Sequence, residues 1–230
     1  ASSEEQVKRL NTSVVAYASD YIQQFNAYGF EVGTQDGANK NSDTIYFIAF
    51  KANDSTIYTG KYTGNGTADT DISCCGSDTP TGVWVFTQML ADAAAVSFDT
   101  SPTMTGTSWG TNSLDTANSF DGSSSGNFRV DTDNLVNNNT KTYPYVAFVD
   151  DASTMTSGTF TGDGNTGRNI TTTGVDPAAV FVKCDGTVMA MRFASLGAGN
   201  VSMRVNTTSI SITNHISALG TGQFTIEDGQ

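Results

Sequence analysis

The stretch Thr142-Tyr-Pro-Tyr-Val-Ala-Phe148 has a counterpart 98 positions earlier, Thr44-Ile-Tyr-Phe-Ile-Ala-Phe50. When the chain is aligned outward from this pair, residues 30–72 match residues 128–170 without a gap, and 15 of the 43 aligned pairs are identical. Many of the identical residues are the glycine, asparagine and phenylalanine residues that turns and strands require. The sequence therefore predicts a duplicated structural unit.

The repeat continues on both sides of this alignment. After one gap, Pro80-Thr-Gly-Val-Trp-Val matches Pro177-Ala-Ala-Val-Phe-Val, and the strand around Phe30 recurs around Phe224 as a third copy. Apolar residues alternate, or form short runs between turn residues, which predicts strands over residues 29–33, 44–51, 57–63, 82–87, 127–131, 142–149, 157–162, 179–183, 188–194, 201–205 and 222–227. So many short strands predict an all-β chain of β-sandwiches.

The N-terminal residues follow a different period. Apolar residues recur at helical spacing over residues 3–27, behind a Ser-Ser-Glu-Glu start that is typical of a capped helix, and Gly29 follows. This pattern predicts a helix over residues 3–27.

Composition and charge argue against two classes of partner, nucleic acids and membranes. The formal net charge is −12, and the eleven basic residues form no cluster, so we expect no nucleic-acid partner. No apolar run is long enough to span a bilayer, so we expect no membrane insertion. Three cysteines cannot all pair with one another, which leaves open a bridge from Cys184 to Cys74 or Cys75, or free thiols.

The order of several short motifs resembles a known family, the concanavalin-like jelly-roll repeats found in tandem in bacterial secreted proteins and in phage tail and virion proteins. Its opening is matched by GKYTGNGTADTDI and then TPTGVWVF, and again by GTFTGDGNTGRNI and then VDPAAVFVK. Its ending is matched by GFEVGTQDGANKNSDTIYFIAF and by NFRVDTDNLVNNNTKTYPYVAF. The resemblance implies two tandem jelly-roll domains and an extracellular location, as a cell-surface filament or a virion component.

The same resemblance implies the domain boundaries. Residues 53–150 correspond to one complete repeat, and residues 151–230 to a second repeat without its closing strand. Residues 1–52 are then an N-terminal extension, with the helix over 3–27 and the surplus strands 29–33 and 44–51. The strand that the second repeat lacks is present in this extension.

A sandwich without its closing strand exposes backbone groups and part of its core, and strand addition from another chain is a known way to cover them. We therefore expect copies of the chain to join head to tail into a filament. The expected interface comprises Thr44, Ile45, Tyr46, Phe47, Ile48, Ala49 and Phe50, together with Phe224 and Ile226. Two alternatives stay open: closure within one chain, and a carbohydrate-binding adhesin or a phage tail or virion module cut from a longer tandem array.

Candidate sites for other chemistry are weaker. The lone His215 has no G-x-S-x-G partner, so we expect no enzyme and no cofactor. Asp69, Asp71 and Asp163 lie in oxygen-rich turns and are candidates for calcium, although aspartate is also a common turn residue. Trp109 lies in a predicted loop and is a candidate contact for a glycan.

Overall fold

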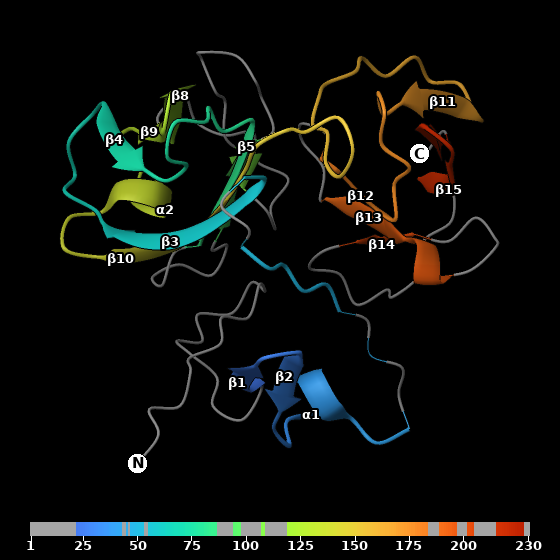
Figure 1. Ribbon diagram of the computed structural model, residues 1–230, viewed down its shortest axis with the longest axis horizontal. Helices are drawn as coiled ribbons and strands as arrows, with labels where there is room; N and C mark the ends of the chain where they lie inside the picture. Colours follow the sequence, from blue (N-terminus) through green and yellow to red (C-terminus); the bar gives the residue numbers. More distant parts are fainter. Residues whose placement is uncertain are drawn as a thin grey trace.

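A computed structural model describes residues 22–42, 45, 47–52, 55–86, 94–97, 107–108, 119–183, 189–196, 202–204 and 215–227. These residues form several antiparallel sheets with only short helical segments, which confirms the all-β prediction (Figure 1). No helix in this described part is long and apolar enough to cross a membrane. Below, residues 53–150 are called the first repeat and residues 151–230 the second repeat.

Two sheets enclose the core of the first repeat. A five-stranded sheet has the order β3 (Ile57–Thr63), β10 (Thr142–Phe148), β5 (Gly82–Phe86), β6 (Ala94–Ser97) and β7 (Thr107–Ser108). A three-stranded sheet has the order β4 (Thr70–Ser73), β9 (Asn127–Val130) and β8 (Phe120–Ser124). Side chains alternate along each strand, so one face of β10 is buried between the sheets through Tyr143, Tyr145 and Ala147.

The second repeat reproduces part of this arrangement. Its sheet β11 (Arg168–Thr171), β16 (Gln223–Ile226) and β15 (Ile216–Gly220) has the order of β4, β9 and β8. A second sheet has the order β12 (Ala179–Val182), β13 (Ala190–Phe193) and β14 (Met203–Arg204). Directly after β13, the chain forms the 3-10 turn η1 (Ala194–Leu196). Val180, Ile216 and Phe224 form the centre of its core.

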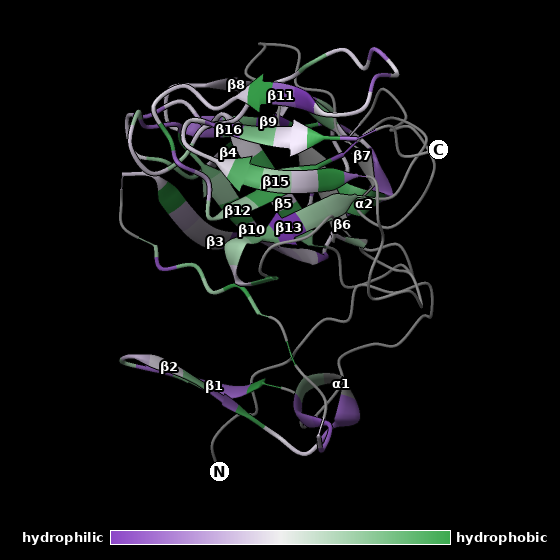
Figure 2. Cartoon of the chain, turned by 90° about the vertical axis from the view of Figure 1, so that its right-hand side faces the viewer, coloured by the Kyte–Doolittle hydropathy of each residue, from purple (hydrophilic) through white to green (hydrophobic). Residues whose placement is uncertain are grey.

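The N-terminal segment corrects the helix prediction. Residues 22–26 form a strand, β1 (Ile22–Asn26), which pairs with β2 (Gly29–Val32), so the helix predicted over 3–27 is wrong in this part; residues 1–21 lie outside the described chain. Pairing with β2 across a tight turn outweighs the helical spacing. The hairpin and helix α1 (Asp36–Asn39) lie apart from the other sheets (Figure 2).

These three elements have the same bounds as elements of the first repeat, shifted by 98 residues. β1 matches β8, β2 matches β9, and α1 matches α2 (Asn134–Asn137). The next element of the first repeat after α2 is β10, whose counterpart is residues 44–50. Residues 22–39 therefore repeat the elements β8, β9 and α2 of the first repeat, and residues 44–50 repeat the sequence position of β10.

The backs of two sheets meet in an aromatic cluster between the repeats. Trp84, Phe148 and Met189 are buried there, and the rings of Trp84 and Phe181 are 5.3 Å apart. Phe50 packs on the same cluster, 5.5 Å from the ring of Trp84 and 5.7 Å from that of Phe148. Phe148 and Phe50 thus lie between the repeats and not inside one sandwich, because inward-facing positions of β10 have odd numbers.

Candidate assembly site

The first repeat shows how a closing strand is held. β10 lies between β3 and β5, and Tyr145 is opposite Gly60 on one side and Val85 on the other. A Cβ atom built on Gly60 would lie 2.5 Å from the hydroxyl oxygen of Tyr145, and one built on Gly64 would lie 2.4 Å from the carbonyl oxygen of Asn138. Both glycines are therefore needed for the closing segment to approach.

The corresponding place in the second repeat is open among the described atoms. Gly158 and Gly162 match Gly60 and Gly64 in sequence, yet a Cβ atom built on either has no atom within 4 Å. Gly164, the counterpart of Gly66, has the same positive φ, 72° against 71°, and likewise faces open space. The second repeat has kept the glycines without the segment that requires them.

The strand predicted over residues 157–162 is absent. Its counterpart β3 pairs with β10 along seven residues, whereas no described strand pairs with residues 157–162, which have no regular structure. Phe160 is 36% exposed, while its counterpart Tyr62 stacks on Tyr143 of the closing strand at 5.2 Å. A strand requires a neighbour for its backbone groups, and the described residues supply none here.

The strand predicted over residues 44–51 is absent for the same reason. Residues 45 and 47–52 have no regular structure, and Ile45, Phe47 and Ile48 are 44%, 67% and 40% exposed. Residues 44 and 46 lie outside the described chain. The two missing strands are the two that would be neighbours if the second repeat were built like the first.

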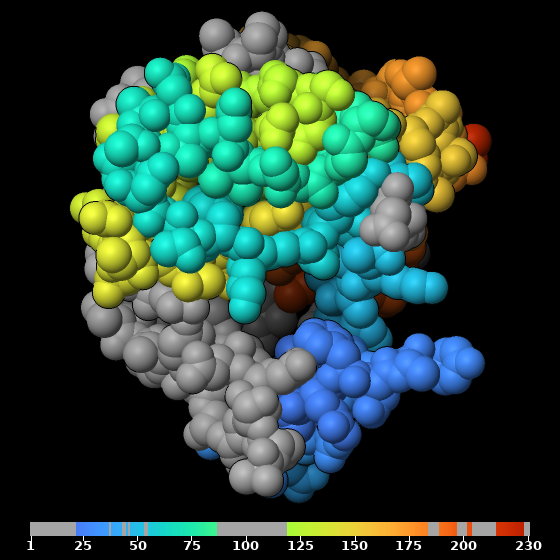
Figure 3. All heavy atoms as spheres, turned by 60° about the vertical axis from the view of Figure 1, so that its left-hand side comes forward, coloured from blue at the N-terminus to red at the C-terminus, as the bar shows by residue number. Residues whose placement is uncertain are grey.

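Parts of the N-terminal segment 22–50 already have the conformation of their counterparts in the first repeat. The rings of Phe30 and Phe47 meet edge to face at 5.1 Å, as those of Phe128 and Tyr145 do at 5.2 Å. Ser42 has a φ of 66° and its counterpart Thr140 a φ of 68°, a left-handed conformation that non-glycine residues rarely adopt. The hairpin β1–β2, helix α1 and the turn at Ser42 are therefore preformed, whereas the described residues of 44–50 are not yet a strand. The preformed part, in blue, lies at one end of the molecule (Figure 3).

Two further predicted interface residues lie beneath the open place. Phe224 is buried in the core of the second repeat, and its ring contacts that of Phe160 at 6.2 Å. Tyr62 and Phe128 make the corresponding contact at 5.9 Å. Ile226 is partly buried against the same core, in β16.

The calcium candidates occupy ordinary structural roles. Asp71 forms an ion pair with Arg129 at 2.8 Å, and this hydrogen bond lowers the pKa of Asp71. Asp163 accepts from the backbone N–H of Asn165, which lowers its pKa, and Arg168 lies 3.6 Å away. Asp69 lies beside Asp121, whose pKa is raised by the hydrogen bond between them. No group of three or more metal-ligating side chains occurs in the described part of the chain.

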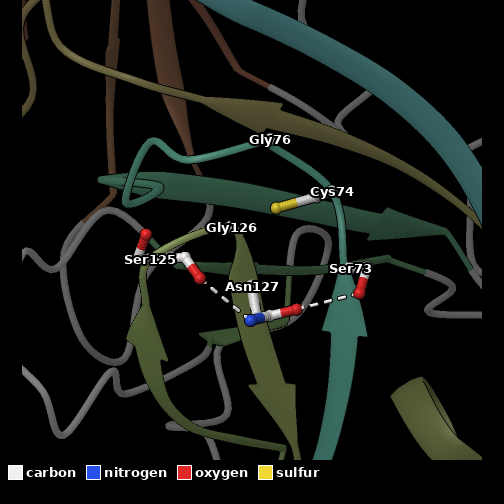
Figure 4. A pocket seen from close by; sticks show the side chains of 6 residues that line it. All are labelled: Ser73, Cys74, Gly76, Ser125, Gly126 and Asn127. Atoms are coloured by element: carbon white, nitrogen blue, oxygen red, sulfur yellow. Dashed lines mark hydrogen bonds between the residues drawn. The ribbon is translucent and has the colours of Figure 1, made fainter.

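A shallow hollow lies at the end of β4 (Figure 4). Ser73, Cys74, Gly126 and Asn127 are among its lining residues, and Asn127 bonds Ser73 at 3.0 Å. Cys74 is bonded to the adjacent Cys75, which corrects the expected alternatives of free thiols at these positions or a bridge to Cys184. The sequence alone did not predict a bond between these two neighbouring cysteines. Trp109, the candidate glycan contact, lies outside the described residues.

Comparisons with known proteins add no family to this picture. No protein-family model matches the sequence, and no curated protein and no solved structure matches it significantly.

Proposed function

We propose that the chain is a non-enzymatic structural subunit, built from two jelly-roll-like repeats, that polymerises outside the cell. Each copy would donate residues 44–50 to the second repeat of the next copy. The observation that supports this most strongly is a matched pair of segments, residues 44–50 as donor and residues 157–162 as acceptor, for which the described residues contain no strand partner.

The pairing in the first repeat specifies the proposed register. Shifted by 98 residues, the pairs of β10 with β3 place Phe47 opposite Gly158, and Phe50 opposite Met155. On its other side the donor would pair with β12, with Phe47 beside Val182. The ring of Phe47 would cover Gly158 as the ring of Tyr145 covers Gly60.

A second copy is the proposed source of the donor. The chain's own Phe50 packs on Trp84 and Phe148, in a cluster to which Met155 of the second repeat also belongs. In contrast, Ile45, Phe47 and Ile48 stay exposed, and no described atom lies within 4 Å of a Cβ atom built on Gly158. Donation to the next copy recreates the same open contact at each step, and a heterologous contact of this kind makes a filament when it does not close into a ring.

The Cys74–Cys75 bond supports the extracellular part of the proposal. Disulfides persist in oxidising compartments and are rare in the cytosol. Core residue Cys75 is fully buried, so the bond is part of the folded first repeat and not an exposed pair of thiols.

Deleting residues 1–51 is expected to abolish assembly. The full chain should form multimers whose mass, measured by light scattering, rises with concentration, whereas the truncated chain should remain monomeric with a less protected second repeat in hydrogen exchange. A synthetic peptide spanning residues 28–51 should restore that protection, and a peptide of the same composition in scrambled order should not. If the truncated chain still polymerises, or if its second repeat is as protected without the peptide, the module of a longer array replaces this proposal.

A further inference from the structure

In the first repeat, the closing half is attached by more than its strand. The side chain of Asn137, the last residue of α2, is fully buried. Its Oδ1 accepts from the backbone N–H of Asn65 at 2.9 Å, and its Nδ2 donates to the carbonyl oxygen of Thr67 at 2.7 Å. Its own carbonyl oxygen accepts from the backbone N–H of Gly66 at 2.9 Å. One asparagine therefore ties α2 to the turn that follows β3.

The turn after the helix adds two more bonds. The backbone N–H of Thr140 donates to Gly64 at 2.9 Å, and the N–H of Gly64 donates to the carbonyl oxygen of Lys141 at 2.8 Å. These two bonds extend the register of β10 and β3 beyond the pair Thr142–Thr63, whereas the bonds of Asn137 lie outside that ladder. Helix and turn form a second contact beside the strand.

The counterparts of both sides of this contact are present in the chain. Asn39 is identical to Asn137 and ends α1 as Asn137 ends α2. The acceptor turn is also kept: Asp163 Oδ1 accepts from the N–H of Asn165 at 3.0 Å, as Asn65 Oδ1 accepts from that of Thr67 at 2.9 Å. The open turn is therefore shaped for the side chain that occupies it in the first repeat.

Asn39 is exposed, and its side chain forms a hydrogen bond within the N-terminal segment 22–50. Its Nδ2 donates to the carbonyl oxygen of Gly33 at 2.9 Å. In the first repeat, the Nδ2 of Asn137 instead donates to Thr67, across the contact. Docking would therefore exchange one hydrogen bond within the donor for bonds to the acceptor.

We propose that the donor is the whole segment 36–50 and that Asn39 determines its specificity by docking on the turn Gly162–Asn165 of the next copy. The Oδ1 of Asn39 would accept from the N–H of Asp163, and its Nδ2 would donate to the carbonyl oxygen of Asn165. This inference rests on the proposed function and adds a partner surface to the strand site. It also gives Asp163 a role as a turn residue of the acceptor.

The test uses labelled peptides and the full chain carrying Phe47→Asp, which disables the chain's own donor and leaves its acceptor open. A peptide spanning residues 22–52 should bind, as measured by fluorescence anisotropy. Asn39→Ala in the peptide should weaken binding by about 10- to 100-fold, because the N–H of Asp163 and the carbonyl oxygen of Asn165 lose their hydrogen-bond partners. Lys40→Ala is the matched control, because the side chain of its counterpart Asn138 bonds only within its own half, to Asn134, and binding should be unchanged.

A shorter peptide, spanning residues 43–52, tests the contribution of α1 without any substitution. It contains the strand without α1, and it should also bind at least about tenfold more weakly than residues 22–52. If this short peptide and the Asn39→Ala peptide both bind as tightly as the unchanged one, the inference is overturned while strand donation stands. If the unchanged peptide does not bind at all, the proposed function itself fails.

Discussion

Gly158→Val is expected to abolish assembly and to leave the single chain as stable as the unchanged protein. No atom of the described residues lies within 4 Å of a Cβ atom at this position, so the added side chain meets open space among them. In the assembly it would occupy the place of the donor's Phe47, opposite Gly158 in the proposed register. Light scattering would measure assembly, and thermal unfolding would measure the stability of the single chain.

Gly60→Val is the matched control for this substitution. The same change in the first repeat brings a Cβ atom to 2.5 Å from the hydroxyl oxygen and 2.6 Å from the ring of Tyr145, so it should destabilise the fold by about 1–3 kcal/mol or more. The two glycines are counterparts in sequence, and only the presence of the closing strand distinguishes them. If the Gly158→Val variant assembled to the same extent as the unchanged protein, the proposed site would be contradicted.

Phe47→Asp is expected to weaken assembly by about a thousandfold or more. Phe47 is 67% exposed in the single chain, so the substitution should change the stability of that chain little. Docking would bury it as Tyr145 is buried, which contributes about 1.5–3 kcal/mol for an apolar side chain. Burying an unpaired carboxylate there would cost several kcal/mol instead, and each 1.4 kcal/mol is a factor of about ten.

Phe25→Asp provides the control for Phe47→Asp. Phe25 is 68% exposed and lies in β1, outside the proposed donor, so the same loss of an exposed ring should leave assembly unchanged. Comparing the two by sedimentation velocity at equal concentration separates a specific contact from a general loss of surface hydrophobicity. Equal effects of both substitutions would contradict the donor assignment.

Much of the fold could be predicted because its determinants are local. β3 and β9 alternate inward and outward residues between turn residues, β5 and β10 are short apolar runs, and the structure places strands at all four. The structure extends the repeat offset of 98 to β1 and β8, which share no identical residue, beyond the sequence alignment that begins at residue 30. At residues 22–26 the prediction follows the helical spacing over the competing family alignment, which places a strand and loop within residues 12–27, and the element predicted there is wrong.

Two segments without a described strand partner show that a local sequence pattern does not decide whether a strand forms. Residues 44–50 and 157–162 have strand-like sequences, but a strand forms only where a neighbour accepts and donates its hydrogen bonds. The sequence indicated which two segments belong together. That Gly158 faces open space, and that Ser42 already has the backbone conformation of Thr140, required coordinates.

The most direct measurement is cross-linking of the proposed pair. A chain with Ile48→Cys, Ser157→Cys and Cys184→Ser, treated with a short bismaleimide, has its two new thiols opposite each other in the proposed register, where Cβ atoms are about 5 Å apart. The account predicts a ladder of covalent multimers on a denaturing gel, which either single cysteine variant fails to give. A single band at the mass of one chain, with the two cysteines linked within it or not linked at all, would contradict assembly by strand donation between copies.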